Sequence, residues 1–221
     1  MGSHYKIRTE KTGHYFMHGT VTSETKYVWI CLHGYGELGK YFIRHFEFLD
    51  PSENLVIVPE GMNRYYTDEK HERVAAHWMT REDRLDEIAD YVLFLEALRS
   101  KLTWDKNSNL KVIYFGFSQG VTTLIRWLTA IQPPADYILM WAGGIPDDIV
   151  FDHSRLYFEK INSHYFIGDK DQYLNNESMQ VMKKLLAQTG MKTEIHSFAG
   201  DHRIDDDVLK NWVQKNINPP G

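Results

Sequence analysis

Short apolar runs alternate with helical patterns along most of this chain. The helical or loop stretches between the runs predict an α/β fold, with a mostly parallel central sheet and helices on both faces. The runs are rich in β-branched and aromatic residues and predict strands at Tyr27–Leu32, Leu55–Val58, Lys111–Phe115, Tyr137–Trp141, His164–Ile167 and Thr193–Phe198.

The N-terminal region has a different pattern. Tyr5–Arg8 and Tyr15–Val21 are short alternating segments separated by Thr9–Gly13. They predict a hairpin that extends the sheet with antiparallel strands at one edge.

The clearest helical pattern covers Arg81–Leu102, with Thr80 and Asp83 placed as an N-cap residue and its partner. We expect its apolar face to cover one side of the sheet. That face consists of Leu85, Ile88, Ala89, Val92, Leu95 and Leu102.

No regular pattern is visible between Glu60 and Met79, which makes this an unusually long connection. Long connections in compact domains are often binding loops, so we predict that Tyr65, Tyr66 and Trp78 line a substrate entrance. The alternative is that these aromatic side chains only anchor a surface loop. The C-terminal Asn218–Gly221 is typical of a loose tail.

Composition limits the class of protein. A chain of 221 residues with 43% hydrophobic content can bury one sizeable core, so we expect a single domain over residues 1–221. A net charge of −5 and the lack of a basic stripe argue against a nucleic-acid partner. No apolar segment has the length of a membrane span or signal sequence, so we predict no stable membrane insertion and a cytoplasmic location. The single cysteine, Cys31, lies in a strand pattern and is expected in the core.

The segment Gly116-Phe117-Ser118-Gln119-Gly120 lies between an apolar strand pattern and a helical one. Glycines on both sides of a serine permit an abrupt turn from strand to helix, which exposes the hydroxyl as a nucleophile. The same turn directs the backbone N–H of Gln119 and the positive end of the helix at a developing oxyanion.

A serine nucleophile needs a base and an acid, which follow it in the order Asp, His on an α/β-hydrolase scaffold. Asp171 follows a strand that breaks at Gly168 and is the favoured acid, with Asp169 as the alternative. His202 lies in the loop after the last strand and is the favoured base. His196 lies within that strand, where a histidine is more often packed than catalytic.

A second glycine-rich turn, Leu32-His33-Gly34-Tyr35-Gly36-Glu37, follows the first central strand. We expect the N–H of Tyr35 to be the second oxyanion donor. His33 is expected to brace this loop by hydrogen bonding and to take no part in the chemistry.

These motifs together resemble the phospholipase/carboxylesterase family of α/β-hydrolases, which includes the acyl-protein thioesterases. The turn Ala142-Gly143-Gly144-Ile145-Pro146 is also similar to one in that family. The resemblance implies Ser118 as nucleophile, Asp171 and His202 as its partners, and Tyr35 and Gln119 as oxyanion donors. This chain departs from the family pattern at Glu37, at Val121 and over Met62–Trp78.

We therefore predict a serine esterase that forms an acyl-enzyme on Ser118 and needs no metal or organic cofactor. Carboxylic esters are the leading substrates, followed by thioesters and lysophospholipids; a homodimer is left open. Trp127 and Trp141 are either pocket walls or core residues. His14 and His18 have the spacing of helical metal ligands, but in an extended segment they lie roughly 13 Å apart. A serine peptidase and a catalytically silent binding protein on the same scaffold are the alternatives.

Overall fold

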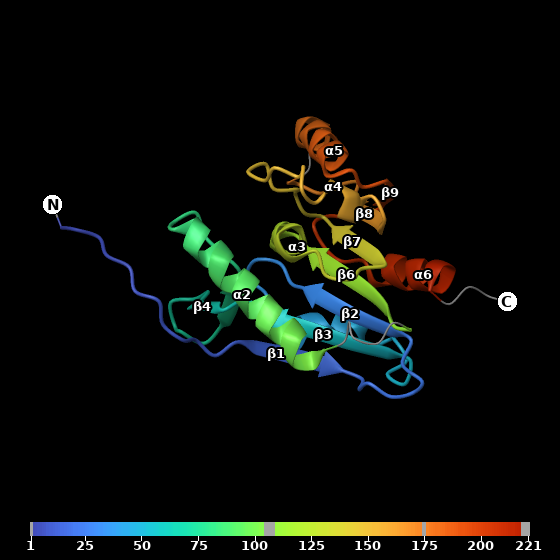
Figure 1. Cartoon of the computed structure of the whole chain (residues 1–221), viewed down its shortest axis with the longest axis horizontal. Coiled ribbons are helices and arrows are strands. Elements are labelled where there is room, and N and C mark those ends of the chain that lie inside the picture. The colour runs from blue at the N-terminus through green and yellow to red at the C-terminus, as the bar shows by residue number, and fades with distance from the viewer. Residues whose placement is uncertain (1, 104–108, 174–175, 218–221) are drawn as a thin grey trace.

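The computed structural model describes residues 2–103, 109–173 and 176–217. The tail Asn218–Gly221 lies outside these residues. Seven strands form one sheet, in the order β1-β3-β2-β6-β7-β8-β9 (Figure 1). All its neighbouring strands are parallel except β1 and β3, so the mostly parallel sheet is confirmed. The strands are β1 (His14–His18), β2 (Tyr27–Leu32), β3 (Asn54–Glu60), β6 (Lys111–Phe117), β7 (Tyr137–Trp141), β8 (Asn162–Gly168) and β9 (Thr193–Phe198).

The antiparallel edge forms differently from the prediction. Tyr5–Arg8 is not a strand, and the side chains of Tyr5 and Ile7 are exposed. Instead, β1 pairs directly with β3, and its extended backbone holds both His14 and His18. The strand ends before Gly19, whose φ of +84° turns the chain where a Cβ atom would lie 2.2 Å from the carbonyl oxygen of Asn54. Two alternating residues were too weak a signal for a separate N-terminal strand.

Helices cover both faces of the sheet (Figure 1). Side chains of α2, α3, α4 and α5 pack on one face, whereas α1, η1 and α6 pack on the other. The helical bounds are α1 (Gly39–Phe42), the 3-10 helix η1 (Ile43–Phe46), α2 (Arg84–Leu102), α3 (Gln119–Ile131), α4 (Arg155–Phe158), α5 (Asn176–Thr189) and α6 (Asp206–Asn216).

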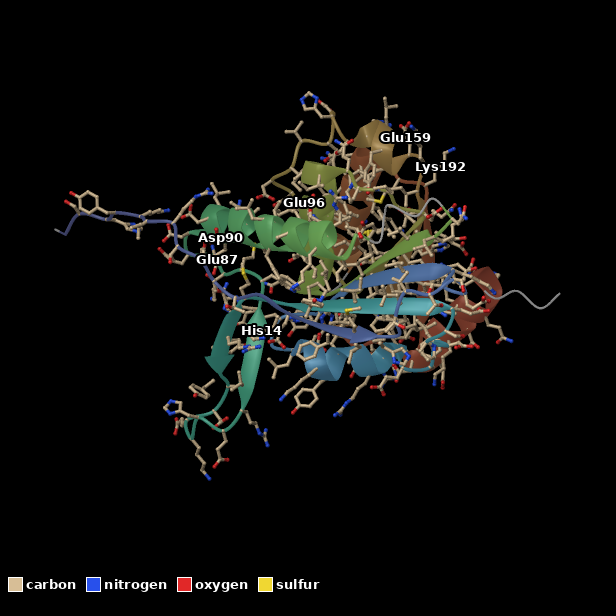
Figure 2. The ribbon with its side chains drawn as sticks, turned by 60° about the horizontal axis from the view of Figure 1, so that its bottom comes forward. His14, Glu87, Asp90, Glu96, Glu159 and Lys192 are labelled. Carbon is tan, nitrogen blue, oxygen red and sulfur yellow. The ribbon has the colours of Figure 1, made fainter. Side chains whose placement is uncertain are left out.

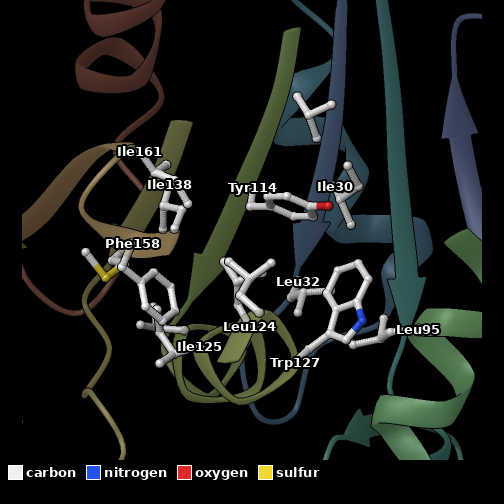
Figure 3. Packing of buried hydrophobic residues seen from close by; sticks show 14 of the residues in the cluster. Ile30, Leu32, Leu95, Tyr114, Leu124, Ile125, Trp127, Ile138, Phe158 and Ile161 are labelled. Carbon is white, nitrogen blue, oxygen red and sulfur yellow. The ribbon is translucent and has the colours of Figure 1, made fainter. Parts of the chain in front are cut away.

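Alternation along the buried strands divides the core between these two faces. Ile30 and Leu32 of β2 face α3, where Leu124 and Trp127 meet them (Figure 3). Cys31 faces the opposite side and is buried, as expected. The continuous apolar runs of the sequence thus reflect strands that are covered on both sides.

Helix α2 begins three residues later than predicted. Asp83 at its N-cap position has a left-handed φ of 45° and makes no side-chain cap. Thr80 instead donates its backbone N–H to the Glu87 carboxylate. Leu85, predicted on the apolar face, is exposed, while Leu98 and Tyr91 are buried. Within the described ranges, no helix combines the length and apolar character needed to cross a bilayer.

The segment between β3 and α2 is not an irregular connection. It forms an antiparallel hairpin of β4 (Asn63–Tyr66) and β5 (Val74–His77), which projects away from the main sheet (Figure 2). His14 at the start of β1 lies near its base. Each strand has only four residues and no alternation of apolar and polar side chains, so the sequence contains little signal for it.

Candidate active site

Ser118 lies at the sharp turn between β6 and α3. Its backbone has φ 51° and ψ −117°, a conformation that L-residues rarely adopt. The turn is possible because neighbouring positions have no side chain. A Cβ atom on Gly116 would lie 2.8 Å from Val121, and one on Gly120 would lie 2.1 Å from the carbonyl oxygen of Leu32. Both glycines are therefore required by close backbone approach, as expected from the motif.

Ser118, His202 and Asp171 form a continuous chain of hydrogen bonds. Nε2 of His202 lies 2.9 Å from Oγ of Ser118, and Nδ1 of His202 lies 2.8 Å from Oδ2 of Asp171. The Asp171 side chain is fully buried, and its other oxygen accepts the backbone N–H of Tyr173 at 2.9 Å. Since ionised Asp171 can only accept, Nδ1 of His202 donates to it and Nε2 is free to accept from Ser118.

The alternative acid and base have other partners. Asp169 accepts the backbone N–H of Gly200 at 3.0 Å and so ties together the loops after β8 and β9. His196 remains within β9, where its ring stacks on Phe166 at 4.6 Å and its Nε2 lies 3.0 Å from Nδ1 of His164. Neither residue is part of the chain at Ser118.

The loop after β2 holds Tyr35 beside Ser118. Gly34 donates its N–H to Glu37 at 2.7 Å, and Gly36 donates to the carbonyl of Ala76 at 2.9 Å. Among the described residues, no acceptor binds the N–H of Tyr35 between them. Desolvation raises the pKa of the Glu37 carboxyl above its ordinary value, although the Gly34 N–H opposes this shift.

His33 braces the same loop from below. Its Nδ1 donates to the carbonyl of Gly34 at 2.7 Å, while its Nε2 accepts the N–H of Gly61 at 2.9 Å. The indole Nε1–H of Trp78 donates to the carbonyl of His33 at 2.9 Å. His33 is completely buried, and desolvation lowers its pKa to about 4. The ring is therefore neutral at pH 7 and serves as a structural connector.

The side chain of Gln119 does not face the reacting groups. Its amide oxygen accepts the backbone N–H of Trp78 at 2.9 Å, and its amide nitrogen donates to the carbonyl of Met79 at 2.7 Å. These two bonds fix the first turn of α3 against the segment after β5. Only the backbone N–H of Gln119 can face the site. It belongs to the first N–H groups of a helix, which have no partner within the helix.

A cavity of about 750 Å³ opens beside Ser118 and His202. Tyr35 and Gln119 contribute to its lining near the hydroxyl. Its apolar wall comes from the loop after β7 and from one face of α5. The apolar residues are Ala142, Ile145, Pro146, Val181, Met182 and Leu185.

Polar groups lie farther along the cavity. Thr122 and Arg126 follow Ser118 at intervals of four residues on α3 and line the same side. Arg126 is almost buried and forms an ion pair of 2.7 Å with Asp148, which also pairs with Arg84 at 3.0 Å. Sequence reasoning missed these positions, although the four-residue period after Ser118 predicts that they share its helix face.

The aromatic residues predicted at the substrate entrance have different positions. Trp78 is 1% exposed and Trp141 0%, so their assignment to substrate binding is wrong. Trp141 stacks on Phe166 at 4.5 Å and donates its Nε1–H to the carbonyl of Arg203 at 2.8 Å. Trp127 is likewise a core residue.

The two tyrosines of the hairpin lie in different surroundings. Tyr66 is exposed on the hairpin, where its ring lies 4.7 Å from that of His71, and it does not line the cavity. Tyr65 packs on Tyr35 with ring centroids 5.5 Å apart, so it reaches the cavity only through that residue. A substrate role for Tyr65 stays a prediction.

The strand order, the turn at Ser118 after a central strand, and the loop residues at the carboxyl ends of β8 and β9 define an α/β-hydrolase fold. The sequence profile of the phospholipase/carboxylesterase family matches residues 20–218. The chain belongs to this family, which is a family of esterase-type hydrolases.

Solved structures support the same fold. Esterase PE8 has 18% identity and a TM-score of 0.65, with 93% of this chain and 99% of that one covered. Acyl-protein thioesterase 2 of Zea mays has 16% identity and a TM-score of 0.69 over 93% and 99%. The Bacillus cereus carboxylesterase has 15% identity and a TM-score of 0.66 over 92% and 94%. No curated protein sequence matches the chain significantly.

Proposed function

We propose that the protein is a serine esterase that hydrolyses carboxylic esters through an acyl-enzyme on Ser118. The observation that supports this most strongly is the chain of hydrogen bonds from Ser118 through His202 to Asp171, at 2.9 and 2.8 Å. A serine hydroxyl is a weak nucleophile until a base removes its proton. This arrangement provides a base at hydrogen-bonding distance and a buried carboxylate to orient it.

In the acylation step, Oγ of Ser118 attacks the ester carbonyl carbon while Nε2 of His202 takes the hydroxyl proton. The Asp171 carboxylate stabilises the resulting imidazolium and holds its Nδ1–H. His202 then gives the proton to the departing alkoxide, which leaves as an alcohol. In the second step, His202 deprotonates a water molecule that attacks the acyl carbon. The bond from this carbon to Oγ of Ser118 then breaks, Oγ takes the proton back from His202, and the carboxylic acid is released.

The negative charge on the former carbonyl oxygen requires donors that are already in position. We assign this role to the backbone N–H groups of Tyr35 and Gln119. The Tyr35 donor lies between two N–H groups that are paired with Glu37 and Ala76, which fixes its loop. Removing one such donor typically costs about 10²–10³ in kcat.

The cavity favours an acyl group of modest size. Its apolar wall suits a hydrocarbon chain, because burial of each CH₂ group contributes about 0.8 kcal/mol. Thioesters and lysophospholipids are the next substrates to test. Acyl-protein thioesterase 2 of Zea mays, a structural neighbour, provides the reason to include thioesters.

The test is hydrolysis of p-nitrophenyl esters from acetate to palmitate by the parent protein and by Ser118→Ala. We expect the parent to be active and the variant to lose about 10⁴-fold or more in kcat. Ser197→Ala is the matched control, since Ser197 is exposed on β9 and away from the cavity. The chain length at which kcat/KM is highest measures the depth of the acyl site.

A fluorophosphonate probe distinguishes the alternatives. Stoichiometric labelling of Ser118, detected by mass spectrometry, is expected for an esterase. A folded parent protein that neither hydrolyses these esters nor reacts with the probe would refute the proposal and favour a silent binding protein. Cleavage of peptide substrates alone would favour the serine peptidase.

A further inference from the structure

Three potential metal ligands gather on the outer strands of the sheet, away from the cavity. His164 lies on β8, and Glu194 and His196 lie on β9. In the parallel register His164 is opposite Glu194, and Phe166 is opposite His196. Because side chains alternate between faces, all three project from the same face of the sheet, which is the face covered by α6.

Their ligand atoms have mutual distances that suit a small divalent ion. Nδ1 of His164 and Nε2 of His196 are 3.0 Å apart. Oε2 of Glu194 lies 3.6 Å from the His164 nitrogen, and Oε1 of Glu194 lies 3.8 Å from the His196 nitrogen. Ligands at about 2.0–2.2 Å from a tetrahedral zinc ion are roughly 3.3–3.6 Å from each other. With one oxygen of Glu194, the three ligand atoms lie within 4.8 Å of one another, so a rotation of the exposed carboxylate would bring them to coordination distance.

The two histidines are held in place by aromatic packing. The ring of His164 lies 5.0 Å from that of Trp212 on α6 and 6.4 Å from that of Tyr137 on β7. The ring of His196 stacks on Phe166. Two imidazoles that are already oriented lose little conformational freedom when they bind an ion, which favours binding.

Glu194 provides the negative charge of the site and its opening to solvent. The Glu194 side chain is 60% exposed, so the cluster opens to solvent on its side and a water molecule can complete the coordination. Among the described residues its carboxylate has no partner except the two histidines. The nearby ammonium of Lys215 opposes a cation, whereas the Glu194 charge favours one.

The two imidazoles are joined by a hydrogen bond between the nitrogens that would bind the ion. Their mutual hydrogen bond needs one ring nitrogen as acceptor, so at least one ring is neutral. When both nitrogens bind an ion, the ring that donates this hydrogen bond moves its proton to its other ring nitrogen and stays neutral.

We propose that His164, Glu194 and His196 form a zinc(II) site that links β8 to the edge strand β9. Two imidazoles and one carboxylate are a donor set that zinc accepts readily. None of the three residues lines the cavity beside Ser118, so the site stabilises the sheet edge and takes no part in ester hydrolysis. The proposal does not depend on the proposed function.

The test uses the full chain after dialysis against a chelator. Zinc chloride is titrated at pH 7.5 by isothermal calorimetry, and thermal unfolding is followed with and without zinc. We expect one zinc ion per chain and a rise in Tm, because a ligand that binds only the folded state stabilises it. Cobalt(II) in place of zinc is expected to give the visible absorption bands of a four-coordinate ion.

The variants His196→Ala and Glu194→Gln identify the ligands. Each is expected to weaken zinc binding at least tenfold and to remove the cobalt bands. His153→Ala, at an exposed histidine elsewhere, is expected to bind as the parent does. Circular dichroism of each variant checks that it is folded.

Two results would overturn the proposal. One is a parent protein that binds no zinc in the calorimetric titration and whose Tm does not change when zinc is added. The other is unchanged binding in His196→Ala combined with loss of binding in His202→Ala, which would locate the ion at the Ser118 site. Because ester hydrolysis is measured separately, failure of the zinc site leaves the esterase proposal unaffected.

Discussion

Acidification tests the role of His33, which joins the loop that holds Tyr35 to Gly61 through hydrogen bonds. Its Nε2 accepts the Gly61 N–H, so protonation of the ring would abolish this hydrogen bond. It would also place a positive charge in a fully buried position. We therefore expect His33 to remain neutral in the folded protein and to make folding unfavourable at low pH.

The magnitude follows from the difference between the folded and unfolded pKa values. Desolvation lowers the pKa of His33 from 6.5 to about 4. A histidine whose folded pKa is depressed leaves stability intact above the unfolded pKa and removes it as pH falls toward the folded pKa. At 1.36 kcal/mol per pH unit, acidification from pH 7 to pH 5 costs about 2 kcal/mol from this residue alone.

The assay is urea unfolding at pH 7, 6 and 5, followed by tryptophan fluorescence, for the parent and His33→Gln. Glutamine does not titrate, and contributions from all other groups largely cancel in the difference between the two proteins. We expect the stability advantage of the parent to decrease by about 2 kcal/mol between pH 7 and pH 5. Two proteins with parallel pH profiles would refute the reasoning.

A second measurement applies even where the variant is poorly folded. NMR titration of the parent gives the pKa of the His33 ring directly. A value above 6 would show that burial does not depress the pKa, and that the ring tolerates protonation in place.

Three further substitutions test the site and its support. Asp171→Asn is expected to lower kcat by about 10⁴-fold in the ester assay while the protein stays folded, because an amide no longer selects the correct histidine tautomer; a loss below tenfold would contradict its role. Gly120→Ala places a methyl group 2.1 Å from the carbonyl oxygen of Leu32 and is expected to lower the free energy of unfolding by more than about 3 kcal/mol; near-normal stability in urea would show that strand and helix can separate there. Trp78→Phe removes the donor to the buried carbonyl of His33 and is expected to cost about 1–3 kcal/mol in urea unfolding and to reduce kcat; unchanged values of both would mean that water replaces the indole.

The sequence predicted the central strands of the sheet well because they are buried on both sides. Tyr27–Leu32 and Tyr137–Trp141 have the predicted bounds, since a continuous apolar run has no other stable position in an α/β fold. The edge strand Thr193–Phe198, which is largely exposed, was predicted from its alternating sequence. The need for glycines on both sides of Ser118 was predicted equally well, because close backbone approach there tolerates no other residue. The juxtaposition of Ser118, Asp171 and His202 followed from their positions at strand ends.

The errors concern segments whose structure depends on distant contacts. The hairpin of β4 and β5 has an exposed tip and strands of only four residues without apolar alternation, so its local pattern is weak. Trp78 was predicted at the cavity because it lies in the long connection between Glu60 and Met79. Its burial depends on hydrogen bonds to Gln119 and His33, which are 41 and 45 residues away in the chain. Local sequence contains no signal for such contacts.

The base and the tip of the β4–β5 hairpin have different roles. At its base, Ala76 accepts the Gly36 N–H and so belongs to the frame of the Tyr35 loop. Its tip closes on itself, because Asp68 accepts the N–H groups of Glu72 and Arg73. Tyr66, near this tip, does not line the cavity beside Ser118, so sequence inserted between residues 68 and 72 is expected to leave the loop that holds Tyr35 unchanged.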